Sequence, residues 1–535
     1  DMYLRKSLKL GVAAAVLAAV MPLSAANADG KITIGLGSEP TSIDPHFHNL
    51  GPNNQIAQHI FSRLVEQDEK QRLSPGLAES WKAINETTWE FKLRKDVKFH
   101  DGSAFNADDV MFTMKRAPAH PNARSSFKLY SHGGGKVYKK IDDYTIQVTT
   151  PRPYPLMATD LSTIHIVSNE IGDETWEGEF NNGKAAIGTG PYKLVRWIKG
   201  EVLQLSRYDD YHGEKPEWSV VEIKPIKSAP SRLAALLAGD VDFIDSVPTV
   251  DIARLKKDPN LSLSQGVSNR VIYLHLDQHR DVAPYTTAKD GSEIKNPFKD
   301  VRVRRAISKA INRDLIIDRV MEGVAIKAGQ LLPEGFFGRS DKLMPEEYDA
   351  AGAKKLLSEA GYPDGFKTTL FGPNDRYIND AKIVEAIAQM LSRIGIDTTP
   401  ETMPKSVYFK RAKNRGPEKP PEFGFVLVGW GSGTGEPSSP LKSLLATYNK
   451  DKGYGSSNRG LHANPKMDAV LEEALASVDD DKRAKLLAKA TEIGVGEDVG
   501  IIPLHYQVNT WAAKKGLTYV ARTDERTLAM GISSK

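Results

Sequence analysis

The residues best suited to holding a small molecule lie in a glycine-rich stretch, GWGSGTGEPSSP, at residues 429–440. An apolar run typical of a buried strand, EFGFVLV, leads into it. Glycines at alternate positions leave the backbone N–H groups open to a ligand, while Trp430 offers a stacking face. Ser432 and Thr434 add hydroxyl donors and acceptors. We predict that one wall of a binding site is formed by Trp430, Ser432, Gly433, Thr434 and Gly435; a structural turn is the alternative.

A second candidate is GPNDRYIND, residues 372–380, directly before a helix-like segment. Its arginine, Arg376, can hold a carboxylate or phosphate with two parallel hydrogen bonds, and such a contact survives burial better than a lysine contact. We predict that Arg376, with Tyr377 beside it, clamps an acidic ligand. The alternative is a surface arginine near the start of a helix.

A third candidate is SEPTSIDPH, residues 38–46, which follows the strand-like run KITIGLG. Its polar side chains Ser38, Glu39 and Thr41 can each hydrogen-bond a ligand. We predict that they form the wall opposite the glycine-rich stretch. The alternative is a rigid loop set by its two prolines.

The elements that must position these residues alternate between strand-like and helix-like patterns, so we predict a mixed α/β chain with two or three domains. Residues 231–239 form a short helix stopped by Gly239 and followed by the strand VDFID. Residues 378–394 form a longer helix with one apolar face, ended by Gly395. Earlier in the chain, TTWEFKL and VKFHDG predict two strands that feed a helix capped by Asn106.

The stretch from Pro75 to Val110, PGLAESWKAINETTWEFKLRKDVKFHDGSAFNADDV, closely resembles the family of extracytoplasmic solute-binding proteins that serve dipeptide, oligopeptide and nickel ABC importers, bacterial extracellular solute-binding protein family 5. Further segments resemble that family in the same order along the chain. They are SEPTSIDPH, IGTGPYKLVRW (187–197), NPFKDVRVRRAISKAINRDLI (296–316), AKKLLSEAGYPDGF (353–366) and GWGSGTGEP (429–437).

The resemblance implies a three-lobed α/β periplasmic binding protein fold of type II, cluster C. Lobe I is discontinuous, and the ligand cleft lies between lobes I and III. The expected ranges are 29–70, 187–270 and 500–535 for lobe I, 71–186 for lobe II and 271–499 for lobe III. We expect hinges near residues 267–276 and 500–506, since these segments cross between lobes.

The resemblance also bears on ligand chemistry. Peptide-binding members carry an aspartate three residues after the tryptophan of the glycine-rich stretch, and it receives the peptide's α-amino group. Gly433 stands at that position here, and Glu39 or Glu436 is the candidate replacement. Arg376 roughly matches an arginine that pairs with the ligand's carboxylate. The stretch is closer to relatives that take glutathione, opines or sugars than to standard dipeptide binders.

Residues 1–28 combine three basic residues, an apolar run and a small-residue end, the pattern of a cleaved secretory signal peptide. Removing them lowers the formal net charge from +4 to +2, and the charges are interleaved, so neither nucleic acid nor membrane is an expected partner. The chain has no cysteine to carry a disulfide or a lipid. We predict a monomer in a Gram-negative periplasm.

Two segments of the sequence suggest functions other than binding an acidic solute. The segment His132-Gly133-Gly134-Gly135 imitates an esterase oxyanion hole, but no serine sits in a G-x-S-x-G elbow, so we predict no enzyme activity. His46, His48 and His59 suggest a nickel or metallophore ligand, yet no metal motif accompanies them. We therefore predict no cofactor and no metal. The predicted protein is the substrate-binding component of an ABC importer, capturing a small polar, acidic solute such as a peptide, a glutathione-like compound, an opine or a sugar.

Overall fold

The computed structural model describes residues 30–121 and 127–535. The predicted signal peptide, residues 1–28, lies outside this part. Among the described helices, none is both long enough and apolar enough to cross a bilayer.

One sheet of 11 strands runs through most of the molecule in the order β15-β14-β16-β12-β17-β11-β1-β10-β9-β8, with β13 paired to β17. One half contains β1 (Lys31–Leu36), β8 (Tyr192–Ile198), β9 (Val202–Arg207), β10 (Val220–Pro225) and β11 (Phe243–Ile244). The other contains β13 (Ala325–Lys327), β14 (Phe366–Pro373), β15 (Ile396–Met403) and β16 (Phe425–Gly431). Buried parallel strands such as β1 carry near-continuous apolar runs, and KITIGL is one.

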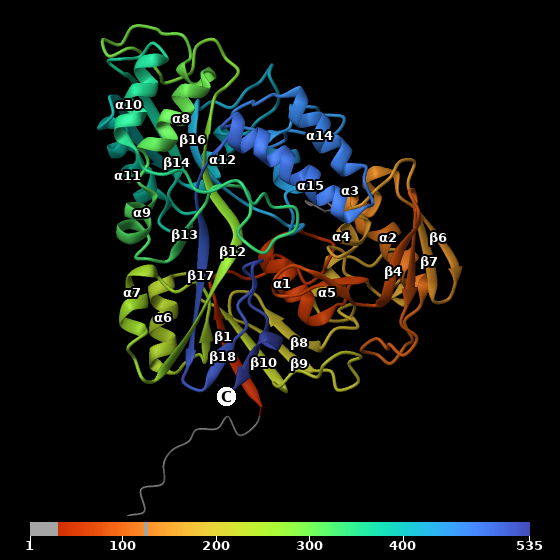
Figure 1. Cartoon of the computed structure of the whole chain (residues 1–535). Helices are drawn as coiled ribbons and strands as arrows, with labels where there is room; N and C mark the ends of the chain where they lie inside the picture. Colours follow the sequence, from red (N-terminus) through yellow and green to blue (C-terminus); the bar gives the residue numbers. More distant parts are fainter. Residues whose placement is uncertain (1–29, 122–126) are drawn as a thin grey trace, which may run out of the picture.

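Two long strands, β12 (Leu261–Leu276) and β17 (Ile502–Lys514), pair antiparallel and connect the two halves (Figure 1). Their register shifts between Val267 and Val271, where residues 268–270 bulge out of the ladder. A bulge bends and twists a strand locally. The bend therefore lies within the segment 267–276, where we expected a hinge.

Helices cover both halves of the sheet. The first half carries α1 (Gly51–Ile60), α6 (Ala229–Ala238), α7 (Thr249–Leu255) and the small pair β18 (Leu517–Tyr519) and β19 (Ile532–Ser534). The second carries α8 (Val301–Ala310), α9 (Arg313–Leu315), α10 (Ala350–Glu359), α11 (Asp380–Ser392), α12 (Lys405–Arg411), α13 (Ser438–Pro440), α14 (Pro465–Leu475) and α15 (Asp480–Thr491). Two predicted helices are confirmed as α6, with Gly239 left-handed at its end, and α11.

A separate sheet, in the order β4-β5-β7-β6, stands beside the central one and appears in orange in Figure 1. This region holds β2 (Val65–Gln67), β3 (Leu73–Pro75), β4 (Ala78–Asn85), β5 (Thr88–Leu93), β6 (Val137–Asp142), β7 (Thr145–Thr149), α2 (Ala107–Ala119), α3 (Phe127–His132) and α4 (Met157–Leu161). The short helix α5 (Glu177–Asn181) instead packs through Phe180 on the core of the half that contains β1.

Part of the local prediction for this region is confirmed and part is wrong. Asn106 caps α2 in a reciprocal capping box with Asp109. The run VKFHDG, however, forms a single bridge, Lys98 to Ala104, around a turn instead of a second strand. The strands that flank β5 are β4 and β7, which supply the longer ladders.

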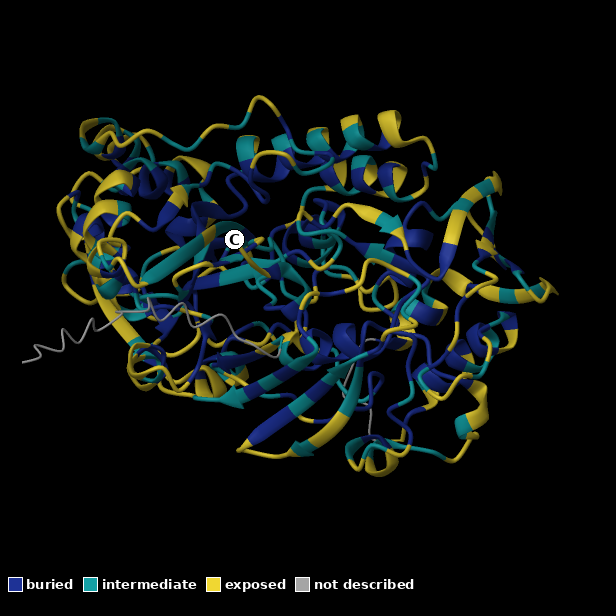
Figure 2. Ribbon diagram, turned by 90° about the horizontal axis from the view of Figure 1, so that it is seen from below, coloured by how far each residue is buried: buried dark blue, intermediate teal, exposed yellow. Residues whose placement is uncertain are grey.

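The buried apolar residues gather in clusters that follow these regions. The largest runs from Val271 to Tyr506, another from Leu64 to Ile166, and two further clusters belong to the half that contains β1. Figure 2 shows this as dark blue inner faces beneath helices whose outer faces are yellow. The clusters therefore follow the two halves of the central sheet and the separate sheet, and the lobe boundaries remain a prediction.

Candidate functional site

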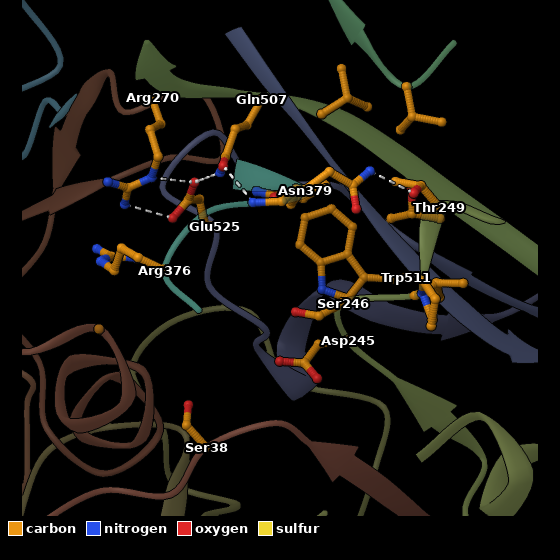
Figure 3. Close-up of a pocket in the computed structure, with 18 of the residues that line it drawn as sticks. Ser38, Asp245, Ser246, Thr249, Arg270, Arg376, Asn379, Gln507, Trp511 and Glu525 are labelled. Carbon is orange, nitrogen blue, oxygen red and sulfur yellow. Dashed lines mark hydrogen bonds and ion pairs between the residues drawn. The ribbon is translucent and has the colours of Figure 1, made fainter. Parts of the chain in front are cut away.

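A cavity of about 910 Å³ lies where the two halves of the central sheet face one another. In the half of the molecule that contains β1, the predicted lobe I, the lining comes from the segment after β1, the start of α1, the β11–α7 turn, β17 and the C-terminal segment. In the half that contains β14, the predicted lobe III, it comes from the start of α11 and Lys405, and Arg270 comes from β12, which connects the two halves. Figure 3 shows these side chains converging from separate elements.

The Asp245 turn, residues 245–248, forms part of the lobe I wall between β11 and α7. The buried Arg232 of α6 holds it in place, donating to the backbone oxygens of Asp245 at 3.1 Å and Ser246 at 3.2 Å. Ser246 has a left-handed backbone with φ of 50°. Such strain persists only where surrounding contacts enforce it, so the arginine fixes an otherwise unfavourable turn.

The carboxyl group of Asp245 belongs to this wall. Its Oδ1 accepts the N–H of Gly37 at 3.0 Å and lies 3.0 Å from Nε of Arg232. Burial is the strongest influence on the group and raises its pKa above the usual value. The carboxylate is therefore held in position but incompletely compensated.

Trp511 of β17 lies in the wall of the cavity (Figure 3) but is only 1% exposed, because its ring packs on Tyr519 in the core. Its Nε1 donates to Thr527 at 2.8 Å, which fixes the ring. The exposed apolar surface of the lining comes from Leu50 and Val250. An apolar surface with a few polar groups around it is typical of small-molecule sites.

The C-terminal segment contributes an ion pair beside the β12 bulge. Glu525 accepts hydrogen bonds from Arg270 at 2.9 and 3.0 Å, from Ser268 at 2.8 Å and from Gln507 at 3.2 Å. Arg270 is the main partner that lowers the pKa of Glu525 to about 2 against the opposing effect of burial. This carboxylate remains ionised and braces the bulge.

The start of α11 forms the lobe III wall. Asp380 accepts the backbone N–H groups of Arg376 and Tyr377, each at 2.9 Å, and so fixes the segment before the helix. The Arg376 guanidinium is exposed, lies over the Tyr377 ring and, among the described residues, makes no ion pair. Lys382 lines the same wall and is also exposed.

Two helices begin at the cavity, α1 from lobe I and α11 from lobe III. Neither residue before the first turn, Leu50 or Asn379, makes a side-chain cap bond. The N-terminus of a helix carries unsatisfied N–H groups and a partial positive charge. The start of α1 therefore favours negative charge in the cavity, as do Arg376 and Lys382. At the start of α11 the Asp380 carboxylate already accepts backbone N–H groups.

The predicted site residues divide into two groups. Ser38 and Arg376 line the cavity. Glu39 instead accepts the N–H of Gly200 at 2.9 Å, and Thr41 bonds Asn53 at 3.3 Å. Tyr377 lies behind the wall, donating to the backbone oxygen of Gly429 at 3.1 Å.

The glycine loop, residues 429–437, lies against the β2–β3 turn and outside the cavity lining. The Ser432 carbonyl accepts from Asn269 at 2.7 Å and Gln71 at 3.1 Å, and the Ser432 and Thr434 hydroxyls approach the Glu436 carbonyl. A Cβ on Gly435, whose φ is 68°, would lie 3.1 Å from Gln71. Trp430 packs on the lobe III core. Gly433 is exposed, and a Cβ there would meet nothing within 4 Å.

The residues behind the other hypotheses have structural contacts. His46 bonds the His165 carbonyl at 2.8 Å, and His59 bonds the Gln55 carbonyl at 2.8 Å. Gly134 and Gly135 have positive φ in a short turn next to Tyr154 and Pro151. Within residues 30–121 and 127–535, no group of three or more metal-ligating side chains is arranged to hold an ion.

Comparisons with known proteins identify the family and the fold of the chain. Residues 72–452 match the model described as bacterial extracellular solute-binding proteins, family 5 Middle. The chain is 29% identical to heme-binding protein A of Haemophilus influenzae, over 95% of this chain and 96% of that protein. It is 28% identical to the glutathione-binding protein GsiB of Pectobacterium atrosepticum, over 90% and 89%.

A solved structure, HbpA2 from Haemophilus parasuis, superposes with a TM-score of 0.79 at 26% identity, covering 94% of this chain and 100% of that one. The periplasmic binding protein DppA from Helicobacter pylori, in complex with peptide STSA, gives a TM-score of 0.73 at 26% identity, covering 95% and 98%. The fold class predicted from the sequence is confirmed.

Proposed function

Because the chain belongs to the family of bacterial extracellular solute-binding proteins, family 5, the substrate-binding components of ABC importers, we propose that its solute is a small acidic molecule held between lobes I and III. The relatives compared are named as binding proteins, and we propose that this chain likewise does no covalent chemistry. We further propose that it acts as a periplasmic monomer, exported by residues 1–28, and passes its solute to a membrane permease.

The observation that carries the proposal is the balance of charge in the cavity. Its lining holds five basic and three acidic side chains. Each acid has an internal arginine partner, whereas Arg376 and Lys382 have no acidic partner within the described part of the chain. Cations that face a cavity without partners attract anionic ligands, and arginine binds carboxylates bidentately.

The size of the cavity fits a solute of this kind. A volume of about 910 Å³ lies within the range of roughly 300–1,000 Å³ usual for small-molecule sites. Leu50 and Val250 supply exposed apolar contact area, and amide and hydroxyl groups complete the lining. A short peptide, a glutathione-like compound, an opine or a phosphorylated sugar meets these demands.

The nickel or metallophore alternative gains no support from the cavity. The described lining contains no histidine, cysteine or methionine. Nickel prefers imidazole and other nitrogen donors, and the lining offers guanidinium, ammonium, carboxylate and amide groups instead.

Solute capture requires the lobes to close, and β12 with β17 is the connection on which they turn. A ligand shifts this equilibrium only through contacts that differ between the open and closed states. Arg376 and Lys382 on lobe III and Asp245 and Val250 on lobe I are placed to make such contacts with one solute.

The test is a thermal-shift screen with glutathione, dipeptides, an opine, and phosphorylated and neutral sugars, backed by native mass spectrometry of freshly purified protein. We expect acidic solutes to raise the melting temperature, because a ligand stabilises the state that it binds.

For the acid that binds, Arg376→Ala is expected to weaken affinity about 30-fold, or about 2 kcal/mol. Arg393→Ala, an exposed arginine at the other end of α11, is the matched control and should leave affinity unchanged. Binding only of neutral solutes would rule out the acidic-solute assignment, whereas equal affinity in the two variants would rule out Arg376 as the residue that holds the acid.

A further inference from the structure

Three carboxylates line the cavity, and two of them are fully compensated by arginine and hydrogen-bond donors of the protein. Asp524 lies 2.8 Å from Arg522 and 3.8 Å from Arg526. Glu525 has Arg270, Ser268 and Gln507 as donors. For both groups the arginines outweigh the effect of burial and lower the pKa. Neither needs a cation from a ligand.

Asp245 differs from both. Its single cationic partner is Arg232, and that guanidinium also donates to the backbone oxygens of Ile226 at 2.6 Å, Ser246 at 3.2 Å and Asp245 itself. The side chain is 20% exposed, against 3% for Arg232, and lies at the cavity in Figure 3. Burial outweighs the partners and raises its pKa, so a further cation at this carboxylate would be favourable.

The two glutamates that the sequence suggested as amine acceptors have other contacts. Glu436 is buried in an ion pair with Arg483, with 2.5 Å between them, and accepts from Ser438. Glu39 accepts from the backbone of Gly200. Neither lines the cavity, whereas Asp245 does.

Resting on the function proposed above, we propose that the solute is an amine-bearing acid whose ammonium group is recognised by Asp245 while its anionic groups face Arg376 and Lys382. Asp245 on lobe I then takes the role that Gly433 on lobe III cannot fill. With two unpartnered cations against one undercompensated carboxylate, the solute carries more anionic groups than ammonium groups. Acidic peptides and glutathione-like compounds meet this description; neutral sugars and amine-free sugar phosphates do not.

Calorimetric titration with paired probes tests the proposal. The probes are glutathione and the dipeptide Glu-Glu, each compared with its N-acetyl derivative, which keeps the carboxylates and removes the charge of the amine. The wild-type protein should bind the free amines at least tenfold more tightly. Asp245→Asn should bring this ratio close to one, since the amide keeps the shape and loses the charge.

The matched control is Asp242→Asn. Asp242 belongs to the same lobe, accepts the Thr33 N–H at 2.8 Å and pairs with Lys514 at 2.6 Å, but does not line the cavity. This variant should keep the wild-type ratio. The wild-type comparison needs no variant, so it remains decisive if Asp245→Asn does not fold.

The outcomes separate the two proposals. Equal wild-type affinity for free and acetylated acids overturns the role of Asp245 and leaves the acidic-solute proposal standing. A preference for free amines that survives in Asp245→Asn overturns the assignment to this residue. If amine-free acids such as phosphorylated sugars bind and the amine-bearing acids do not, the role of Asp245 is overturned and the acidic-solute proposal stands. If only neutral solutes bind, both proposals are rejected, and they are rejected equally if nothing binds.

Discussion

The Asp245 turn and the glycine loop both continue strands of the central sheet, yet only the turn lines the cavity. The turn carries a carboxyl group that is held by one buried arginine and the Gly37 N–H and is 20% exposed at the cavity. The carbonyl of Ser432 in the glycine loop is occupied by Gln71 and Asn269, and the hydroxyls of the loop approach the Glu436 carbonyl. Polar groups that already have partners gain little from a ligand.

The difference shows what the alternating glycines do in this chain. Gly435 permits contact between the loop and the Gln71 backbone. Gly431 leaves room for the Arg270 guanidinium, since a Cβ at residue 431 would lie 3.1 Å from it. Both are close approaches within the protein. Glycine allows such approaches whether the neighbour is a ligand or another part of the chain.

The largest effect is expected from removing the anchor of the Asp245 turn. Arg232→Met should destabilise the protein by about 3 kcal/mol, because the buried Asp245 carboxylate and several backbone oxygens lose their donor. Solute binding should be lost with it. Thermal unfolding and titration measure the two effects.

The control for Arg232 is Arg254→Met, on α7 of the same lobe. Arg254 is 60% exposed and pairs only with Asp251 in its own helix, so its loss should change stability by less than about 0.5 kcal/mol. Similar losses in both variants would show that Arg232 does not anchor the turn specifically.

The next effect concerns Glu525, which connects the cavity to the glycine loop through Arg270. Its folded-state pKa, about 2, is below the ordinary value of 4.5, so the stabilisation is present above pH 4.5 and lost as the pH falls through 2. Glu525→Gln should remove about 2 kcal/mol of pH-dependent stability. This value is smaller than the full pKa difference implies, because solvent at the 26% exposed Glu525 side chain screens the ion pair.

Urea unfolding between pH 5 and pH 2 measures this window. The wild-type protein should lose stability across it more steeply than Glu525→Gln. Parallel curves for the two proteins would mean that folding does not lower the pKa of Glu525 and that its pair with Arg270 adds no pH-dependent stability.

The sequence was a good guide to the fold because local signals agree with tertiary packing. Asn106 caps α2, Gly239 ends α6, and the apolar face of residues 378–394 becomes the buried side of α11. The run VKFHDG was misjudged because strand-like residues form a strand only where a partner ladder is available, and β4 and β7 occupy both edges of β5.

The candidate site was harder to predict for a physical reason. Ser38 and Arg376 were found from their chemistry and neighbours, and both line the cavity. Asp245 and Trp511 are separated by more than 250 residues of sequence and meet only because β11 pairs with β17. The one local sign of a binding residue was the aspartate that ends the strand VDFID, three residues before a proline. Its ion pair with Arg232 cannot be predicted from the sequence, because it depends on the packing of α6.

A moderate effect is expected in the glycine loop. Gly435→Ala places a Cβ 3.1 Å from Gln71 on a backbone with φ of 68°, and should cost about 1 to 2 kcal/mol of stability. Affinity for the solute should stay within about threefold of wild type, since the loop does not line the cavity. A tenfold loss of affinity with unchanged stability would return the loop to the binding site.

The smallest effect is expected at Gly433, where the family's peptide binders carry an aspartate. A side chain there meets nothing within 4 Å, so Gly433→Asp should change stability by less than about 0.5 kcal/mol. It should also leave affinity for ordinary dipeptides nearly unchanged, because the new carboxylate lies outside the cavity lining where Asp245 is placed. Titration of Ala-Ala into wild type, Gly433→Asp and the exposed control Gly178→Asp measures this, since a Cβ at Gly178 also meets nothing within 4 Å. A tenfold gain in affinity at Gly433 alone would make the glycine loop, and not the Asp245 turn, the region that recognises the ligand's amine. It would mean that lobe closure brings the loop to the ligand and that the missing aspartate sets specificity.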